Sequence, residues 1–419
     1  MYFRFSVFLI SVCLCFFTIA EEPANKDTEK NKFQLGTFDI DVTPPAGHDL
    51  AYDPMINSWD MGLRAKGVVL TGSGQPIVLV AIDWIGLYND CHDEFRRALA
   101  LAAGTTSERV AVHTLHQHDA PRGNLNDDFV LAVIHRLELA VINSLKNLSP
   151  VTDIGFGRAE VYEVASNRRP LGADGKVKAT RYTTCLDSAL RAEPEGVIDP
   201  MVSLISFWNE DIPLALLSFY ATHPQSYYRT GIPNPDFPGI ARFFRQLEVP
   251  DALHVHFNGA AGNIGAGKYN DGSHVNRVIL ARRLADGMKR AWDATEKYPA
   301  YASSIGWNTE PVHLPVDHSR ENAFTVRNKS GHAIDLQCMT IDKGRILFMP
   351  GELFVEYQLA AQKMKPGLFV AMAAYGDCGP GYIPTTEAFP QGGYEIRVTR
   401  MLPEVEGVLM DAMKKLLDN

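Results

Sequence analysis

Short apolar runs alternate with longer amphipathic segments along almost the whole chain from Phe33 onward. An apolar run of about four to eight residues is typical of a buried strand, and apolar residues at helical spacing are typical of a helix that packs on one face. The two kinds of segment follow each other without a long linker. This order predicts an α/β fold in which mixed β-sheets are flanked by helices, within a single large domain.

The predicted elements cover most of the chain. We expect strands at residues 33–42, 66–70, 76–82, 109–114, 202–208, 214–221, 252–257, 345–349 and 368–374, and helices at 93–103, 127–145, 275–294, 353–364 and 402–417. The second and third strands flank a Gly-containing turn and therefore predict a hairpin. Gly104 directly follows the first helix, where glycine suits a left-handed C-cap. The sequence shows no internal repeat.

The N-terminus has the pattern of a secretion signal. Arg4 precedes an apolar stretch over residues 5–19, and small residues stand near its end. We predict a signal peptide at residues 1–20, a flexible leader at 21–32 and the folded domain at 33–419, which makes the protein secreted or periplasmic. An uncleaved anchor is the alternative. The apolar run is shorter than the ~20 residues of a membrane span, and no later run replaces it.

Composition narrows the classes of partner. Of the 419 residues, 46% are hydrophobic, which is enough for a large core, and the formal net charge is -9. The sequence has no block of Lys and Arg, so neither nucleic acid nor an anionic membrane surface is expected as the main partner. The cysteines beyond the signal lack the CxxC spacing of a thiolate zinc site, so buried thiols or disulfides are expected: Cys91, Cys185, Cys338 and Cys378.

Residues that can bind a metal or move a proton follow several of the predicted strands. They are His116 with His118, His223, Glu352 and Tyr382. Side chains just past the carboxyl end of a strand stand at the mouth of an α/β sheet, where sites are usually built. In an extended chain, residues two apart face the same side, so His116 and His118 can address one site together.

Each of these residues also has a purely structural explanation. The histidines could be surface or core residues, Glu352 could complement the dipole of the helix that follows it, and Tyr382 could simply pack in its glycine-rich loop. Their shared position at strand ends favours the functional interpretation. Two histidines, one carboxylate and a fourth oxygen donor form a plausible catalytic zinc site with room for water.

Longer motifs surround the same residues. They read Gly36-Thr-Phe-Asp-Ile-Asp-Val-Thr43-Pro, His116-Gln-His118-Asp-Ala-Pro121, Asn167-Arg168-Arg169-Pro170, Ala221-Thr-His223-Pro, Pro350-Gly-Glu352 and Tyr382-Ile-Pro-Thr-Thr-Glu387, followed by Tyr394-Glu395. Together they resemble motifs in the catalytic domain of the neutral/alkaline non-lysosomal ceramidases, which are zinc amidases that cleave the N-acyl bond of ceramide. The resemblance extends over nearly the whole mature chain.

This resemblance implies a role for each residue of the site. His116, His223, Glu352 and Tyr382 would bind Zn2+, His118 would be the adjacent acid or base, and Arg168 and Tyr394 would hydrogen-bond the substrate around the scissile group. The protein would then be a secreted zinc-dependent amidohydrolase whose substrate is ceramide or a smaller N-acyl lipid or amide. The ceramidases continue into a further β-rich domain, whereas this sequence ends at Asn419, which favours a smaller or more polar amide.

One departure from the family changes the expected chemistry. Where ceramidases read Gly-Asp-Val-Ser-Pro-Asn, with a serine in the active centre, this chain reads Gly259-Ala-Ala-Gly262-Asn263. Because Gly262 has no hydroxyl, we expect direct attack by zinc-activated water, with proton transfer by His118 and oxyanion stabilisation by zinc and Tyr394. Alternatively, backbone N–H groups of the glycine-rich turn at residues 259–267 approach the substrate, or the turn is only structural.

Two other classes of function remain open. One is a zinc hydrolase of a different bond, an ester or a phosphoester, since metal-activated water does not by itself select amides. A metallo-β-lactamase-like site is not expected, because its HxHxDH pattern is broken by Ala120. The other class is a secreted, non-catalytic binding protein on the same fold.

Overall fold

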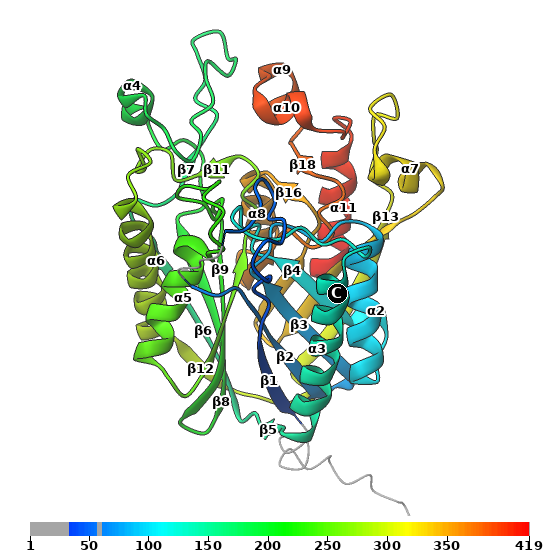
Figure 1. Ribbon diagram of the computed structural model, residues 1–419. Helices are drawn as coiled ribbons and strands as arrows, with labels where there is room; N and C mark the ends of the chain where they lie inside the picture. Colours follow the sequence, from blue (N-terminus) through cyan, green and yellow to red (C-terminus); the bar gives the residue numbers. More distant parts are fainter. Residues whose placement is uncertain (1–32, 57–60, 419) are drawn as a thin grey trace, which may run out of the picture.

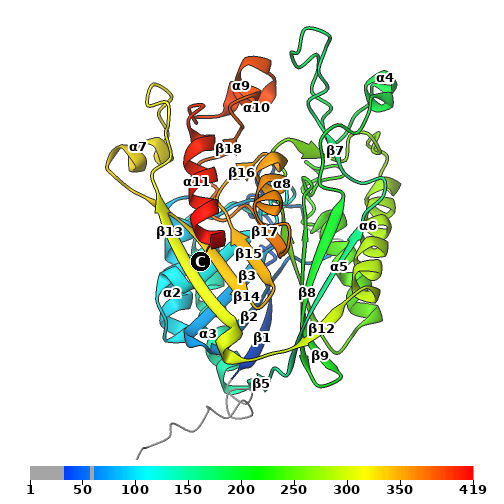
Figure 2. The same cartoon turned by 180° about the vertical axis from the view of Figure 1, so that it is seen from behind.

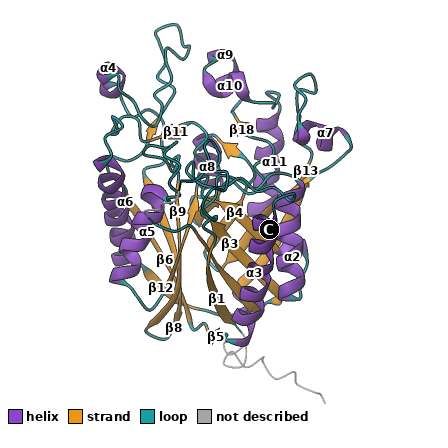
Figure 3. Ribbon diagram, viewed as in Figure 1, coloured by secondary structure: helices purple, strands orange, loops and turns teal. Residues whose placement is uncertain are grey.

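The computed structural model describes residues 33–56 and 61–418 of the chain. Mixed β-sheets stand side by side with helices on their outer faces (Figures 1 and 3), which confirms the predicted α/β architecture. The predicted signal peptide and leader at residues 1–20 and 21–32 lie outside the described residues. Within those described, none of the helices is both long enough and apolar enough to cross a bilayer.

The first sheet has the strand order β4-β3-β2-β1-β5. Strands β1 to β3 are antiparallel, and β4 pairs with β3 in parallel. Helix α2 connects β3 to β4 and ends at Gly104, whose φ of 65° confirms the predicted left-handed cap. The elements are β1 (Gln34–Asp41), β2 (Arg64–Gly72), β3 (Gly74–Ile82), α2 (Asp90–Ala103), the 3-10 turn η1 (Ser107–Arg109), β4 (Val110–Thr114), α3 (Asp128–Lys146) and β5 (Ser149–Pro150).

The second sheet has the order β10-β9-β8-β6-β12, and β10 pairs with β9 in parallel. Its elements are β6 (Asp153–Glu160), β8 (Met201–Asn209), β9 (Ile212–Tyr220), α5 (Asp236–Glu248), β10 (Leu253–Asn258), α6 (Val275–Asp293) and β12 (Glu296–Pro299). A long insertion between β6 and β8 carries β7 (Ser166–Asn167) and α4 (Ser188–Ala192), and β7 pairs with β11 (Ile264–Gly265).

The third sheet has the order β13-β14-β15-β17, with β17 parallel to β15, and Figure 2 shows it with the molecule turned by 180°. Its elements are the 3-10 turn η2 (Ala302–Ser304), β13 (Ile305–Val312), α7 (Ala323–Lys329), β14 (Ile334–Ile341), β15 (Gly344–Phe348), α8 (Val355–Met364) and β17 (Phe369–Ala373). The remaining elements are β16 (Glu352–Leu353), which pairs with β18 (Tyr382–Ile383), then α9 (Ala388–Gln391), α10 (Tyr394–Val398) and α11 (Val405–Asp418).

All three sheets repeat one arrangement, although the sequence shows no internal repeat. In each, three antiparallel strands are followed by a helix, by a fourth strand parallel to the third, and by a second helix. The third and fourth strands are β3 and β4 in the first sheet, β9 and β10 in the second, and β15 and β17 in the third. We call each such group a unit.

The units share one core between their inner faces. Leu79 of β3, Leu217 of β9 and Ile346 of β15 are all fully buried in the same apolar cluster. On the outer face of the first sheet, Phe95 of α2 and Val133 of α3 pack in a second cluster, and α5, α6, α8 and α11 bury their apolar faces in a third. This packing brings the carboxyl ends of the third and fourth strands of all three units together at one end of the molecule.

Candidate metal centre and its cavity

Each unit contributes one residue to a compact cluster at these strand ends. His116 follows β4, His223 follows β9, and Glu352, which opens β16, follows β15. The Nε2 atoms of His116 and His223 lie 3.4 and 3.5 Å from the same atom, Oε2 of Glu352. The structure therefore brings together three of the residues that the sequence predicted as metal ligands.

Backbone carbonyls orient both histidine rings. Nδ1 of His116 lies 2.8 Å from the carbonyl oxygen of Ile85, which follows β3, and Nδ1 of His223 lies 2.9 Å from that of Ala261, which follows β10. A carbonyl oxygen can only accept, so each Nδ1 carries a hydrogen, and in the neutral ring Nε2 then presents a lone pair to the cluster. This arrangement is usual for histidines that bind metals.

The position of the Glu352 carboxylate fits a tetrahedral metal. Its Oε2 atom is buried and has no hydrogen-bond partner among the residues that the structure describes. Zn2+ with ligand bonds of about 2.0–2.2 Å and tetrahedral angles separates neighbouring ligand atoms by roughly 3.3–3.5 Å. The distances from Oε2 to the two Nε2 atoms match that separation. A shared metal would also satisfy the otherwise orphaned oxygen, whose burial would be costly without a partner.

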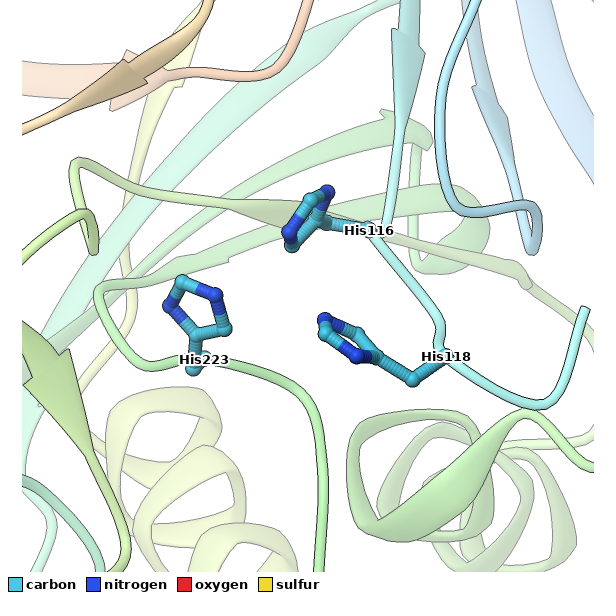
Figure 4. A group of neighbouring side chains, drawn as sticks. All are labelled: His116, His118 and His223. Atoms are coloured by element: carbon cyan, nitrogen blue, oxygen red, sulfur yellow. The ribbon is translucent and has the colours of Figure 1, made fainter. Parts of the chain in front are cut away.

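His118 lies beside this cluster (Figure 4). One nitrogen of each of His116, His118 and His223 falls within 4.8 Å of the others, so a three-histidine donor set is also geometrically available. His118 differs from the other two histidines because its ring faces a side-chain amide: Nε2 of Gln225 lies 3.3 Å from its Nδ1. Its ring also stacks on Tyr52, with centroids 5.4 Å apart.

His116 and His118 do not reach the site through strand alternation, as the sequence suggested. Strand β4 ends at Thr114, and His116 has a φ of +62°, a left-handed conformation that is unfavourable for a non-glycine residue. Tyr375, which follows β17, has the same φ of 62°, and its ring stacks on His116 at 4.7 Å. Strain of this kind costs about 1–3 kcal/mol per residue and persists where the surroundings impose it, often at functional sites.

Tyr382, Arg168 and Tyr394 complete the predicted site. The Tyr382 ring lies nearly parallel to that of His223 at 6.5 Å, and the Tyr394 ring meets it edge-on at 5.8 Å. The Arg168 guanidinium lies over the Tyr382 ring at 5.2 Å from its centroid. These three side chains, the three histidines and Glu352 line the same cavity, so all seven residues that the sequence predicted for the site are brought together.

Arg168 is held by a carboxylate to which the sequence analysis assigned no role. Glu395 is completely buried and accepts from Nε of Arg168 at 2.9 Å and from Nη1 of Arg169 at 2.8 Å. The carboxylate is thus shared between two arginines. Glu395 stands in the motif that also contains Tyr394, so its position in the motif was the signal available from the sequence. No motif in the sequence indicated a role for Gln225, which lies two residues after His223, or for Tyr375.

The glycine-rich turn after β10 packs directly against Glu352. The backbone N–H of Gly262 donates to the carbonyl oxygen of Leu353 at 2.7 Å. A β-carbon on Gly262 would lie 2.2 Å from the carbonyl oxygen of Glu352, far inside contact distance. The Gly262 N–H therefore supports the Glu352 segment, and a serine side chain has no room at this position.

Electrostatics favour an ionised carboxylate at Glu352 and neutral imidazoles at His118 and His223. Burial acts to raise the pKa of Glu352, but the fields of His116 and Arg168 outweigh it, and the pKa lies below its usual value. Burial, reinforced by His116 and Arg168, holds the pKa of His118 well below 6.5. Burial and Arg168 do the same to the pKa of His223. Neutral imidazoles and a carboxylate are the protonation states in which these side chains bind metals.

The cluster lies in the wall of a cavity of about 500 Å³. Such a volume is within the range of small-molecule sites. Two of the tyrosines that line it, Tyr52 and Tyr228, are partly exposed and flank His118.

The four cysteines in the described structure are buried and unpaired, and Cys378 alone among them reaches the cavity wall.

Two solved structures share this fold over 92% of the present chain and 75% of their own. One is a ceramidase complexed with C2, with a TM-score of 0.71 and 16% sequence identity. The other is the neutral ceramidase from Pseudomonas aeruginosa, with a TM-score of 0.70 and 17% identity. No family model matches the sequence, and no curated protein matches it. The chain therefore has a ceramidase-like fold, as its motifs led us to expect.

Proposed function

We propose that this protein is a zinc-dependent hydrolase that cleaves an N-acyl amide bond. The observation that carries the proposal is the orphaned Oε2 of Glu352, equidistant within 0.1 Å from the Nε2 atoms of His116 and His223 in the wall of a cavity. Buried carboxylate oxygens are rarely left without a partner. The ceramidase-like fold supports amide cleavage as the reaction class.

His116, His223 and Glu352 would hold the zinc, with Tyr382 as the fourth protein ligand. In this position zinc supplies a Lewis acid and lowers the pKa of a bound water towards ~7. Burial raises the pKa of the Tyr382 phenol well above its usual value, and Glu352 adds to this effect while Arg168 opposes it. The phenol therefore needs a nearby cation to lose its proton.

The chain's own residues would divide the remaining tasks. His118, neutral and outside the proposed ligand set, would accept a proton at one ring nitrogen and deliver it to the departing amine. Gln225, whose amide faces that ring, would fix its orientation. Arg168 and Tyr394 would donate to the carbonyl oxygen of the scissile amide as it gains negative charge. Since Gly262 offers no nucleophile, hydrolysis would proceed without an acyl-enzyme at that position.

Export is part of the same proposal. The charged start, apolar run and small residues of segment 1–20 support a cleaved signal peptide and a secreted or periplasmic protein. Determination of the mature N-terminus after expression in a host with a secretory pathway would test this. We expect it to fall close to Glu21, and an intact Met1 would contradict it.

The function is tested by metal analysis together with a substrate panel. We expect purified protein to contain about one zinc per chain and to hydrolyse N-acyl amides, with activity lost to a chelator and restored by zinc. The panel should include N-acyl sphingosine, shorter N-acyl amines, and matched esters and phosphoesters. Hydrolysis confined to esters or phosphoesters would replace the amide assignment. Metal binding without any turnover would indicate a binding protein on this fold, and protein that takes up no metal would refute the proposal.

A further inference from the structure

The cavity around the proposed zinc site carries an excess of positive charge. Three arginines line it, Arg122, Arg168 and Arg400, whereas Glu352 is the one carboxylate among the described residues that do so. With the histidines neutral, the lining has a formal charge of 3 − 1 = +2, although the whole chain has a net charge of -9. A cationic concavity in an acidic protein attracts an anionic group in its ligand.

Arg168 has donor capacity left over after its structural contacts. It is 5% exposed, and only its Nε atom is committed to Glu395. Its Nη2 atom is buried and has no hydrogen-bond partner in the part of the chain that the structure describes. Because Glu395 also binds Arg169, it does not fully neutralise Arg168. A buried guanidinium nitrogen without an acceptor, beside a cavity, is a position for a ligand oxygen.

Arg122 and Arg400 also face the cavity without an acidic partner. Arg122 is exposed and lies over the ring of Tyr88, 5.2 Å from its centroid. Nε of Arg400 is buried and unpartnered within the described ranges. Neither guanidinium lies within ion-pair distance of a carboxylate in the described structure, whereas arginines elsewhere commonly do, as Arg242 does with Asp83. Two more guanidinium groups are thus available to a ligand.

The remaining lining is aromatic and polar rather than aliphatic. Six tyrosines line the cavity: Tyr52, Tyr88, Tyr182, Tyr228, Tyr382 and Tyr394. The aliphatic side chains of the lining are those of Ile85 and Val398 among the residues described. A tunnel for two long hydrocarbon chains would be lined mainly by aliphatic residues, since their burial drives such binding. The cavity suits a compact ligand with a polar or charged end.

We propose that the substrate is an N-acyl amino acid, an amide whose amine part carries a carboxylate, and that Arg122 and Arg400 bind that carboxylate while the free Nη2 of Arg168 donates to the neighbouring carbonyl oxygen of the amide. This inference rests on the proposed function and names its substrate class. Guanidinium groups match the two oxygens of a carboxylate. In the reaction, water adds its oxygen to the acyl carbon, the C–N bond breaks, and the nitrogen takes up a proton, so that a carboxylic acid and a free amino acid leave.

A matched pair of substrates isolates the contribution of the carboxylate. N-hexanoylglycine and N-hexanoylethanolamine share the amide and the acyl chain, and differ only in a carboxylate or a hydroxymethyl group. We expect kcat/KM to favour the glycine conjugate by about tenfold to hundredfold, the range for a hydrogen-bonded ion pair. In Arg400→Gln and Arg122→Gln this ratio should fall about threefold to tenfold each, so that the two losses together account for the whole preference. Arg282→Gln, which removes a charge from the exposed face of α6, is the matched control and should keep the ratio.

Because zinc can itself attract a carboxylate, binding to zinc-free protein measures the contribution of the arginines alone. After chelation, titration calorimetry should still show tighter binding of N-hexanoylglycine than of its ethanolamine counterpart, and the double variant Arg122→Gln/Arg400→Gln should bind both equally. If that variant keeps the preference, the arginine assignment is overturned. Arg122 is exposed, so its single variant tests the idea even if the double variant is unstable.

The outcomes distinguish this inference from the proposed function. If no N-acyl amide is hydrolysed, the proposed function fails. If both amides are hydrolysed equally well, the function stands and the N-acyl amino acid assignment fails. An O-phosphorylated N-hexanoylethanolamine serves as a third ligand with a different oxyanion. If it binds zinc-free protein more than tenfold tighter than the glycine conjugate, the carboxylate assignment is overturned in favour of phosphate.

Discussion

Gly262 and Glu352 are packed so closely that a β-carbon on Gly262 would lie 2.2 Å from the carbonyl oxygen of Glu352. That carbonyl belongs to a proposed metal ligand, so the clash cannot be relieved without moving the site. We expect Gly262→Ala and Gly262→Ser each to destabilise the protein by about 1–3 kcal/mol or more, the range for overpacking, and to lower metal affinity. Urea denaturation and metal titration would measure the two effects.

Gly407 provides the control for this prediction. It lies on α11 with nothing within 4 Å of its added β-carbon, so Gly407→Ala should stabilise the protein by about 0.5–1 kcal/mol through helix propensity. If Gly262→Ser instead gains activity over the native protein, the hydroxyl has found room, and the packing argument is wrong.

Substitutions of the proposed metal ligands should reduce zinc occupancy to different extents. His223→Ala removes a proposed ligand and should reduce zinc occupancy from about one per chain to near zero, while Glu352→Gln keeps the shape of the side chain but weakens the oxygen donor. His135, which is exposed on α3, supplies the matched control, since His135→Ala should leave occupancy unchanged. Elemental analysis after dialysis measures all three. Full occupancy in His223→Ala would remove that residue from the site.

His118 should affect turnover without affecting metal binding. If it transfers protons and is not a ligand, His118→Ala should lower kcat by about 10²–10⁴ while zinc occupancy stays near one. Gln225→Ala should produce a smaller loss of kcat with the metal retained, because it frees the ring that the amide faces. Loss of zinc in His118→Ala would instead support the three-histidine donor set, which the geometry also permits.

Much of the fold could be predicted because its central strands are continuous apolar runs. The predicted strand at residues 214–221 corresponds to β9 (Ile212–Tyr220), and the predicted helix at 275–294 to α6 (Val275–Asp293). Strands β13 and β14 were missed because polar and charged residues interrupt their apolar pattern, as Glu310 does in β13 and Asp335 does in β14. Helix α5 was missed as well, although it separates two predicted strands.

The threefold repetition of the units could not be predicted, for a physical reason. A unit requires only that apolar patterns recur in the same order, and many different side chains satisfy that requirement. The site was more accessible, because histidine and carboxylate are chemically distinctive and strand ends position them. Tyr375 could not be predicted as part of the site, because its role depends on a left-handed backbone and on stacking against His116. Neither feature leaves a pattern in the sequence.

We expect substitution of Glu395, which is not a proposed metal ligand, to lower the stability of the protein strongly. It is completely buried and bonded to Arg168 and Arg169, so Glu395→Gln leaves two buried guanidinium groups without their shared carboxylate. We expect a loss of about 3–5 kcal/mol in the free energy of unfolding, the range for a broken buried ion pair. The exposed Glu387→Gln should cost less than about 0.5 kcal/mol. Equal effects in urea denaturation would show that Glu395 is not a structural counter-charge.

Burial of His256, which is not part of the proposed metal site, should make the stability of the protein depend on pH. Burial, with a smaller effect of Arg242, lowers the pKa of His256 from its usual 6.5 to about 3, and the ring bonds Ser218 at 2.9 Å. The unfolded chain therefore takes up a proton before the folded protein does, and this contribution to stability is present above pH 6.5 and is lost as pH falls. Between pH 7 and pH 5 the loss amounts to about 2 kcal/mol.

His256→Gln isolates this contribution, because glutamine does not titrate. In urea denaturation of zinc-free protein, the variant should be less stable than the native chain at pH 7, and the difference should shrink by about 2 kcal/mol at pH 5. Zinc-free protein is needed so that proton-driven release of metal does not add to the slope. His135→Gln, at an exposed position, should differ little from the native chain at either pH. A difference for His256→Gln that stays constant with pH would mean that the folded protein protonates this ring as readily as the unfolded chain does.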